Sequence, residues 1–287
     1  MRRRRCWPRP RTRSRSCRRR SADCARLRLA ATRPALDRRT AVHPHHERAI
    51  AHATETLRRE PGVRALLLGG SLAHGYASEA SDVDLLIVVD DAEWDARMRE
   101  GRVQWATNEA CDWPGGYAEG KYVCPRFLAE VARRGSEPAR FAFADARILF
   151  SQLDDLGATL RAIARYPVEA KTERIRRFGA QLEAWHWYGH EALKRSDRYL
   201  LGLAVARTVL FGGRMLLAHN ELLFPYHKWF LRVLESAPDR PADLMQRIDA
   251  SVRNFRAWED AGAPWPAQFL HDSELAWLTG PTPVDDL

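Results

Sequence analysis

A short apolar segment that ends in two glycines constrains the fold of this chain more than any other feature. Residues 63–70 read VRALLLGG, which is too short for a buried helix and is typical of a buried strand. After a connection of small residues, the segment SDVDLLIVVD at 81–90 predicts a second buried strand. The two segments therefore predict a sheet with a glycine-rich turn between neighbouring strands.

The flanking segments extend this unit. Residues 46–60 place Ile50, Ala53 and Leu57 on one helical face, and Pro61 ends the pattern. The segment 119–128 mixes β-forming residues with a proline, which predicts an edge strand or a short strand. Residues 139–151 fit either a strand or a passage from helix to strand. A small α/β unit with several strands is the expected result.

The character of the chain changes after Pro167, where long segments acquire helical periodicity. Pro225 stands where it can open one of these helices, because proline is tolerated in the first helical turn. We expect a catalytic domain over 41–155 and a helical domain over 156–287. The predicted helices span residues 169–195, 197–219, 226–236, 241–258 and 273–279.

The net charge of +9 lies almost entirely in the first 40 residues. They hold 16 Arg and two acidic residues, hence +14, which leaves −5 for the remaining 247. Few apolar residues and strong like charge predict disorder for 1–40. This tail fits an arm that binds nucleic acid, a targeting peptide, or translation from an upstream start, and these alternatives stay open. The rest of the chain has no excess of positive charge for a polyanion partner.

Cysteine usage and hydropathy indicate a cytoplasmic protein. Of the five cysteines, only Cys111 and Cys124 lie in the part expected to fold, and none has the paired spacing of zinc ligands. Free thiols fit a reducing compartment. No stretch of about 18 or more uncharged apolar residues occurs, so we expect no membrane span.

The glycine turn has the residues of a phosphate-binding site. Gly69 and Gly70 follow the first strand directly, which lets the backbone approach a ligand with its N–H groups turned outward. Ser71 adds a hydroxyl at the start of the next helical turn. Such a turn suits the β and γ phosphates of a nucleotide.

Two aspartates stand two positions apart on the second strand. Asp82 and Asp84 therefore project from one face, while Val83 and Leu85 point into the core. Crowded carboxylates repel each other, and a shared hard cation such as Mg²⁺, bound together with phosphate oxygens, relieves that repulsion. The pair is thus a candidate metal site for phosphoryl transfer.

The combined pattern, GSxxxGxxxxxSDxDL with its internal Gly75 and Ser81, resembles the signature of the DNA polymerase β-like nucleotidyltransferase superfamily. The resemblance implies an α+β fold with a small mixed sheet, Mg²⁺ (or Mn²⁺) as cofactor and ATP or another nucleoside triphosphate as co-substrate. It adds Ser81 to the nucleotide-binding residues. It also implies a third carboxylate from a later strand, for which Glu119 is the first candidate and Asp112 the alternative.

Two further groups are candidates for the nucleotide or acceptor. Lys121 shares the strand parity of Glu119 and can reach a triphosphate as a point charge. Residues 212–230 resemble, in arrangement, the helical domain of aminoglycoside- and lincosamide-type nucleotidyltransferases, which sets acceptor specificity. There Tyr226, His227 and Lys228 are candidates to line the cleft.

Two other patterns are weaker. Arg214 and His219 fit the Arg-x4-His pattern of HEPN ribonucleases, which are found paired with minimal nucleotidyltransferases. Glu183, His186 and His190 share one helix face and could hold a metal, although the neighbouring aromatic residues favour packing between helices. Glu183 or Glu191 could also serve as general base for an acceptor hydroxyl.

Together these features predict a Mg²⁺-dependent enzyme that transfers a nucleoside monophosphate, AMP in our interpretation, to an acceptor hydroxyl. A small molecule of aminoglycoside type suits the acidic folded part, because negative clefts attract cationic substrates. Adenylylation of a protein, as in antitoxins, is the alternative enzyme. A non-catalytic protein that binds nucleic acid through its arginine-rich tail is the alternative outside catalysis.

Overall fold

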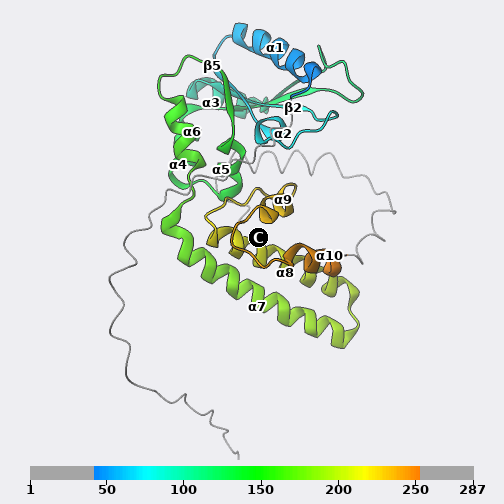
Figure 1. Cartoon of the computed structure of the whole chain (residues 1–287). Coiled ribbons are helices and arrows are strands. Elements are labelled where there is room, and N and C mark those ends of the chain that lie inside the picture. The colour runs from blue at the N-terminus through cyan, green and yellow to red at the C-terminus, as the bar shows by residue number, and fades with distance from the viewer. Residues whose placement is uncertain (1–41, 253–287) are drawn as a thin grey trace, which may run out of the picture. The chain divides into compact units, whose positions relative to one another are not determined.

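The computed structural model describes residues 42–252, all of which belong to one compact unit. The predictions for the 1–40 tail, for the helix at 273–279 and for the end of the helix at 241–258 fall outside the described residues. Within the described part, the fold class is the predicted one: a mixed α+β unit is followed by a helical half (Figure 1).

Five strands form one mixed sheet in the order β3-β4-β2-β1-β5. The β1 strand is antiparallel to both β2 and β5, whereas β2 is parallel to β4, and β3 is antiparallel to β4. Strand β3 was not predicted from the sequence. The strands span Val63–Leu68 (β1), Val83–Val89 (β2), Gln104–Thr107 (β3), Ala118–Val123 (β4) and Arg147–Ser151 (β5).

The sheet is covered on both faces, which explains why β1 and β2 are continuously apolar. Leu66 and Leu68 of β1 pack against α1 (Pro44–Arg59), where Ala53 and Leu57 are fully buried. The alternate β1 side chains, such as Leu67, face a second core built with helices on the other side. Figure 1 shows α1 on one side of the strands and α4, α5 and α6 on the other.

Of the two alternatives for residues 119–128, an edge strand or a short strand, the edge position is wrong and a strand of six residues is found. β4 lies inside the sheet between β3 and β2, because Pro125 is not part of the strand and instead opens α4 (Pro125–Arg134). The segment 139–151 takes the helix-to-strand alternative, with α5 (Glu137–Ala144) followed by β5. The remaining helices of this half are α2 (Gly70–His74), α3 (Asp91–Glu100) and α6 (Leu156–Ala164).

Arg140 joins α4, α5 and α6 into one layer. Its guanidinium is buried and donates to backbone carbonyls at the C-terminal ends of two helices: Ala132 O and Gly135 O at the end of α4, and Ile163 O at the end of α6. Carbonyls at a helix C-terminus lack partners within the helix, and a cation there also complements the helix dipole. The layer therefore presents a fixed support to the sheet.

The helical half is built on a hairpin of α7 (Lys171–Arg195) and α8 (Arg198–His219), which run side by side in Figure 1. Two short helices follow, α9 (Phe230–Glu235) and α10 (Leu244–Val252). The predicted helix at 226–236 begins later than expected. Buried Phe224 and the left-handed backbone of Tyr226 (φ 64°) keep the chain out of helical geometry until Phe230.

One buried carboxylate joins the two halves. Glu137, at the start of α5, is fully buried, accepts the Phe224 amide (2.9 Å) and pairs with Arg174 of α7 (2.9 Å). Because a buried carboxylate without partners would be costly, this contact fixes the loop after α8 against the sheet half.

The helix α8 is long and apolar enough to cross a membrane by length and composition alone. Arg207 and Arg214 divide its apolar sequence, which is why the search for an uncharged apolar stretch predicted no membrane span. In the structure α8 packs along α7, and its Phe211, Leu217 and Ala218 are buried in the core of the helical half.

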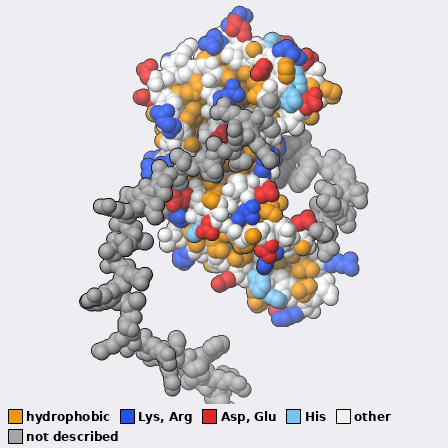
Figure 2. All heavy atoms as spheres, viewed as in Figure 1, with side chains coloured by type: hydrophobic (Ala, Val, Ile, Leu, Met, Phe, Trp, Pro, Cys, Tyr) orange, Lys and Arg blue, Asp and Glu red, His pale blue; other side chains and the backbone are white. Residues whose placement is uncertain are grey.

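Charges of both signs are interspersed on the visible face of the described residues (Figure 2). Neither Lys and Arg nor Asp and Glu gather there into a continuous patch.

Candidate active site

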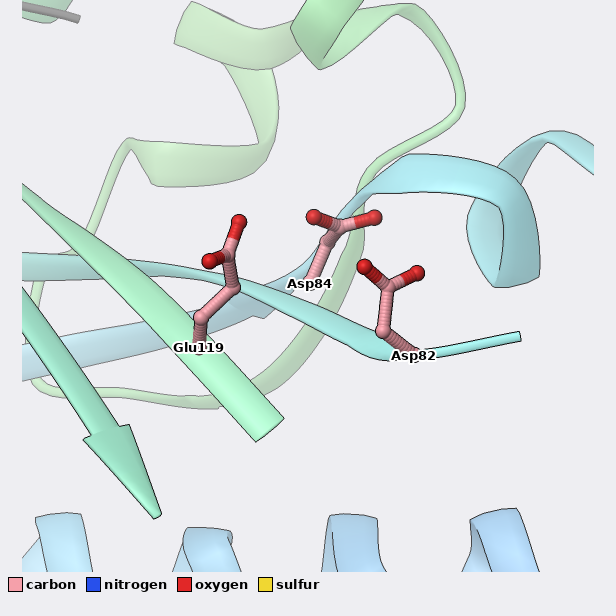
Figure 3. A group of neighbouring side chains, drawn as sticks. All are labelled: Asp82, Asp84 and Glu119. Carbon is pink, nitrogen blue, oxygen red and sulfur yellow. The ribbon is translucent and has the colours of Figure 1, made fainter. Parts of the chain in front are cut away.

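Three carboxylates meet at one end of the central strands. Asp84 on β2 and Glu119 on β4 are direct partners in the parallel register, and Asp82 lies just before β2 begins. One oxygen from each of the three lies within 4.8 Å of the others, and Figure 3 shows all three side chains on the same side of the strands. Strand parity alone aligns Asp82 with Asp84, but the sheet register is what brings Glu119 to them.

The glycine turn lies directly against this cluster. Gly70 opens α2 with a left-handed backbone (φ 57°), and a β-carbon placed there would overlap the Asp84 carboxylate. The Gly69 amide donates to Asp84 O (2.9 Å), which ties the turn to β2. Only glycine both adopts the left-handed backbone readily and leaves room for the Asp84 carboxylate at position 70. The turn and the aspartates thus converge in space, as the sequence predicts.

The surroundings of Asp84 disfavour the negative charge of its carboxylate. Burial raises the pKa of the Asp84 carboxyl above its usual value, and the neighbouring Asp82 carboxylate raises it further. Positive charge from Lys121, Lys228 and His74 acts in the opposite direction on the same pKa. Carboxylates crowded in this way are the donor set that Mg²⁺ or Mn²⁺ prefers, so the residues present fit a divalent cation.

Tyr117 is a neighbour of the cluster that the sequence did not single out. Its hydroxyl donates to Asp82 Oδ2 (2.8 Å), and this hydrogen bond is the main cause of the raised pKa of the phenol. Tyr117 immediately precedes β4, two positions before Glu119. The strand parity that nominates Glu119 and Lys121 would also have pointed to it.

A hollow of about 350 Å³ opens beside the carboxylates. Ser71 Oγ, at its wall, is buried without a hydrogen-bond partner among the described residues, which is unusual for a hydroxyl. An unpaired hydroxyl next to a glycine turn fits an anionic oxygen such as that of a phosphate. The residues that line the hollow are Ser71, Tyr76, Ser78, Ala80, Ser81, Asp82, Tyr117, Lys228 and Trp229.

The helical half contributes two of these lining residues, Lys228 and Trp229, from the loop before α9. The Trp229 ring packs on Tyr76 (4.9 Å between centroids), and the Arg232 guanidinium lies 4.2 Å from the Tyr76 centroid. Of the three predicted cleft residues, Lys228 lines the hollow, whereas Tyr226 and His227 do not.

The structure separates the two candidates for the third carboxylate. Glu119 joins the cluster, whereas Asp112 is an exposed residue paired with Arg48 (2.5 Å). Among the other predicted nucleotide contacts, Ser81 lines the hollow and accepts the Ser78 amide (2.9 Å). Lys121 lies on β4, close enough to lower the pKa of Asp84.

The weaker patterns are not brought together in this site. The guanidinium of Arg214 is buried over the rings of Phe178 and Phe224, while His219 pairs with exposed Asp239. These contacts give Arg214 a packing role.

The histidines of α7 also lie apart from any metal-like group. Among residues 42–252, the one group of at least three potential metal ligands within reach of a single ion is Asp82, Asp84 and Glu119, so Glu183, His186 and His190 do not form another. Glu191 pairs with Lys194 and Arg195 on the helix surface. Trp185 packs into the helical core as expected, whereas Trp187 is exposed.

A glycine turn lies beside clustered carboxylates at one end of the central strands of a mixed sheet, an arrangement that suits metal-assisted chemistry on phosphate groups. The family comparison agrees with this class. Residues 50–122 match the model of the nucleotidyltransferase domain family, a range that includes the turn and all three carboxylates. Residues 50–122 are therefore similar to a nucleotidyltransferase domain.

The chain is also similar to the crystal structure of a nucleotidyltransferase-like protein from Exiguobacterium sibiricum 255-15. The match covers 82% of this chain and 88% of the other. The two share 14% sequence identity with a TM-score of 0.39. No curated protein matches the chain in sequence. The family assignment therefore rests on the sequence match to the domain.

Proposed function

We propose that the protein is a Mg²⁺-dependent nucleotidyltransferase that transfers a nucleoside monophosphate, AMP from ATP, to an acceptor hydroxyl. The observation that carries this proposal is the convergence of Asp82, Asp84 and Glu119 within 4.8 Å of one another beside the Gly70–Ser71 turn. Nucleotidyl transfer needs these two elements together, one for the reacting phosphate and one for the leaving pyrophosphate.

Asp82 and Asp84 would hold the metal: β2 positions the Asp84 carboxylate, and the Tyr117 hydroxyl donates to the Asp82 carboxylate. When bound, the cation supplies neutralisation of charge on the α-phosphate and lowers the pKa of the attacking hydroxyl. The backbone amides of the turn and the Ser71 hydroxyl bind the terminal phosphates from one wall of the hollow. Lys228, which also lines the hollow, binds them as well.

In the reaction the acceptor oxygen forms a bond to the α-phosphorus, and the bond from that phosphorus to the oxygen bridging to the β-phosphate breaks. Pyrophosphate leaves, held by the turn and Lys228. The Glu119 carboxylate accepts the proton of the acceptor hydroxyl, because it lies in the cluster beside Asp82 and Asp84, which would hold the cation.

A small hydroxylated molecule is our proposed acceptor. The part of the chain beyond residue 40 carries a net charge of −5, which favours a cationic compound of aminoglycoside type over a polyanion. The cytoplasm is the proposed compartment, since the described Cys111 and Cys124 are free thiols.

The test is release of pyrophosphate from ATP in the presence of candidate acceptors, with label on the α-phosphate to show where it goes. Small molecules, tRNA and whole-cell protein form separate arms. We expect label on a small molecule, dependence on Mg²⁺ and loss of transfer in Glu119→Gln.

Asp112→Asn is the matched control, because it removes a carboxylate that is exposed and paired with Arg48, away from the cluster. Transfer that is equally strong in Glu119→Gln and the wild type would contradict the role of Glu119. Label found on protein would replace the small-molecule acceptor with protein adenylylation.

A further inference from the structure

Asp82 is the member of the carboxylate cluster that the sheet does not hold. Asp84 and Glu119 lie on β2 and β4 and are fixed by the ladder between them, whereas Asp82 precedes β2. Its neighbours in the chain belong to the turn at 78–81, where Ser81 N donates to Ser78 O (3.1 Å). The Tyr117 hydroxyl restrains the Asp82 carboxylate directly, and the backbone that carries Asp82 depends on what holds this turn.

A histidine from the opposite face of the sheet holds it. His46, in the first turn of α1, is fully buried, and its Nε2 lies 2.9 Å from the carbonyl oxygen of Ser81, the residue directly before Asp82. A carbonyl can only accept, so Nε2 carries the proton and donates. The imidazole links α1 directly to the residue before Asp82.

The surroundings of His46 keep its ring in place. Trp113 packs edge-on against the ring (5.1 Å between centroids), and His45 packs on it from the same helix (4.2 Å). His45 Nε2 in turn lies 2.9 Å from Glu79 O, so two successive histidines bind two carbonyls of the same turn. His46 Nδ1 is buried and has no partner among the described residues, which fits a neutral ring with its single proton on Nε2.

We infer that His46 is a positioning residue for the metal site: its hydrogen bond to Ser81 O sets the backbone from which Asp82 reaches the cation. This inference rests on the proposed function, because it takes Asp82 as a metal ligand. Residues that orient metal ligands from outside the coordination sphere typically contribute about 10- to 100-fold to metal affinity. His46 acts through the backbone of the preceding residue, so we place its effect at the lower end, about tenfold.

The test compares His46→Phe, which keeps an aromatic ring but removes the donor, with His46→Gln, whose amide nitrogen can replace Nε2. The measurement is the affinity for Mn²⁺ by titration calorimetry in the presence of the non-reactive α,β-methylene analogue of ATP, together with the Mg²⁺ concentration that gives half-maximal pyrophosphate release. We expect His46→Phe to weaken both by about tenfold and His46→Gln to restore most of the loss. His46→Leu takes the place of His46→Phe if that variant does not fold.

His52→Phe is the matched control, because His52 lies on the same helix but pairs with exposed Glu109. Unchanged Mn²⁺ affinity in folded His46→Phe, or no recovery in His46→Gln, overturns the inference and leaves the proposed function standing. If the wild type binds no Mn²⁺, both the inference about His46 and the proposed function are overturned. In that case Asp84→Asn also shows no Mn²⁺ binding. Equal losses in His46→Phe and His52→Phe would show a general effect of disturbing α1 and also overturn the inference.

Discussion

The two halves of this molecule hold their functional groups in different ways. In the sheet half, Asp84 and Glu119 are set by the β2–β4 register, and the glycine turn is tied to β2 through Gly69. In the helical half, Lys228 and Trp229 lie on a loop that is held by Phe224, itself bonded to buried Glu137. Groups set by a strand ladder cannot shift independently, whereas groups on a loop can.

This difference separates two kinds of contribution. The sheet half supplies the groups that the reaction itself needs, so changes there are expected to reduce turnover. The helical half supplies one wall of the hollow, so changes there are expected to weaken nucleotide binding with less effect on turnover. The following variants test this division, in order of decreasing effect.

Asp84→Asn is expected to produce the largest loss. Removing a buried metal ligand should lower kcat by about 1,000-fold, because metal stabilisation of the transition state contributes several kcal/mol. Burial and Asp82 raise the pKa of Asp84, so without metal the charged side chain is unfavourable in the folded state at neutral pH. The variant should therefore unfold at a higher temperature than the wild type in EDTA, by calorimetry. A lower unfolding temperature in EDTA would contradict this account of the cluster.

Gly70→Ala should follow. The added methyl group overlaps the Asp84 carboxylate and forces a left-handed alanine, and a misplacement of about 1 Å at the reacting groups costs about 100-fold in kcat. Gly101→Ala is the matched control, since Gly101 also has a positive φ (70°) but faces open space. Steady-state kinetics should show a large loss in Gly70→Ala only. Similar kinetics in both variants would mean that the turn is not part of the site.

Glu137→Gln tests how the halves are joined. The amide keeps an acceptor for the Phe224 N–H but removes the charge that pairs with Arg174, so we expect a loss of about 2 kcal/mol in the free energy of unfolding. Urea denaturation measures it, and the KM for ATP should rise as the loop loses its anchor. In the control Glu173→Gln, whose carboxylate pairs with Arg176 and Arg177 on the helix surface, stability should hardly change. If Glu137→Gln and the wild type had equal free energies of unfolding, Glu137 would not anchor the loop.

Lys228→Met should raise the KM for ATP by about tenfold while kcat changes little, because one charge-assisted contact to phosphate is lost. Inhibition by AMP, which lacks the terminal phosphates, should change much less. Lys194→Met is the control, because Lys194 pairs with Glu191 on the surface of α7. If AMP and ATP were weakened equally, Lys228 would not contact the terminal phosphates, and the division between the halves would need revision.

The smallest expected effect is on the way the free energy of unfolding changes with pH. Burial lowers the pKa of His46 below the unfolded value of 6.5, so the unfolded chain binds the proton more readily. The contribution of His46 to the free energy of unfolding is therefore present above pH 6.5 and is lost as the pH falls below this value. Chemical denaturation of the wild type and His46→Phe at several pH values should show a steeper acid loss in the wild type. Parallel curves would contradict a buried neutral imidazole.

The sequence was informative where chemistry and backbone geometry coincide. The apolar runs of β1 and β2, the glycines at 69 and 70 and the spacing of Asp82 and Asp84 are all local, and local patterns predict strands and turns directly. Glu119 required the family resemblance, because only the parallel pairing of β2 and β4 places it opposite Asp84.

What the sequence could not provide depends on contacts between distant segments. His46 meets Ser81 across 35 positions, and Glu137 meets Phe224 across 87. The segment after Pro225 has a helical pattern, yet buried Phe224 and its bond to Glu137 keep it in a loop and turn until Phe230. Such tertiary contacts override local propensity, so this loop, which carries Lys228, was predicted as a helix.

The central claim is that two neighbouring aspartates and the glycine-serine turn hold a metal-bound triphosphate. Electron paramagnetic resonance of Mn²⁺ with the non-reactive α,β-methylene analogue of ATP tests it without any acceptor. The account predicts that the wild type binds Mn²⁺ tightly only together with the analogue, and that both Asp84→Asn and Gly70→Ala abolish this joint binding. Joint binding of equal strength in Asp84→Asn would contradict it.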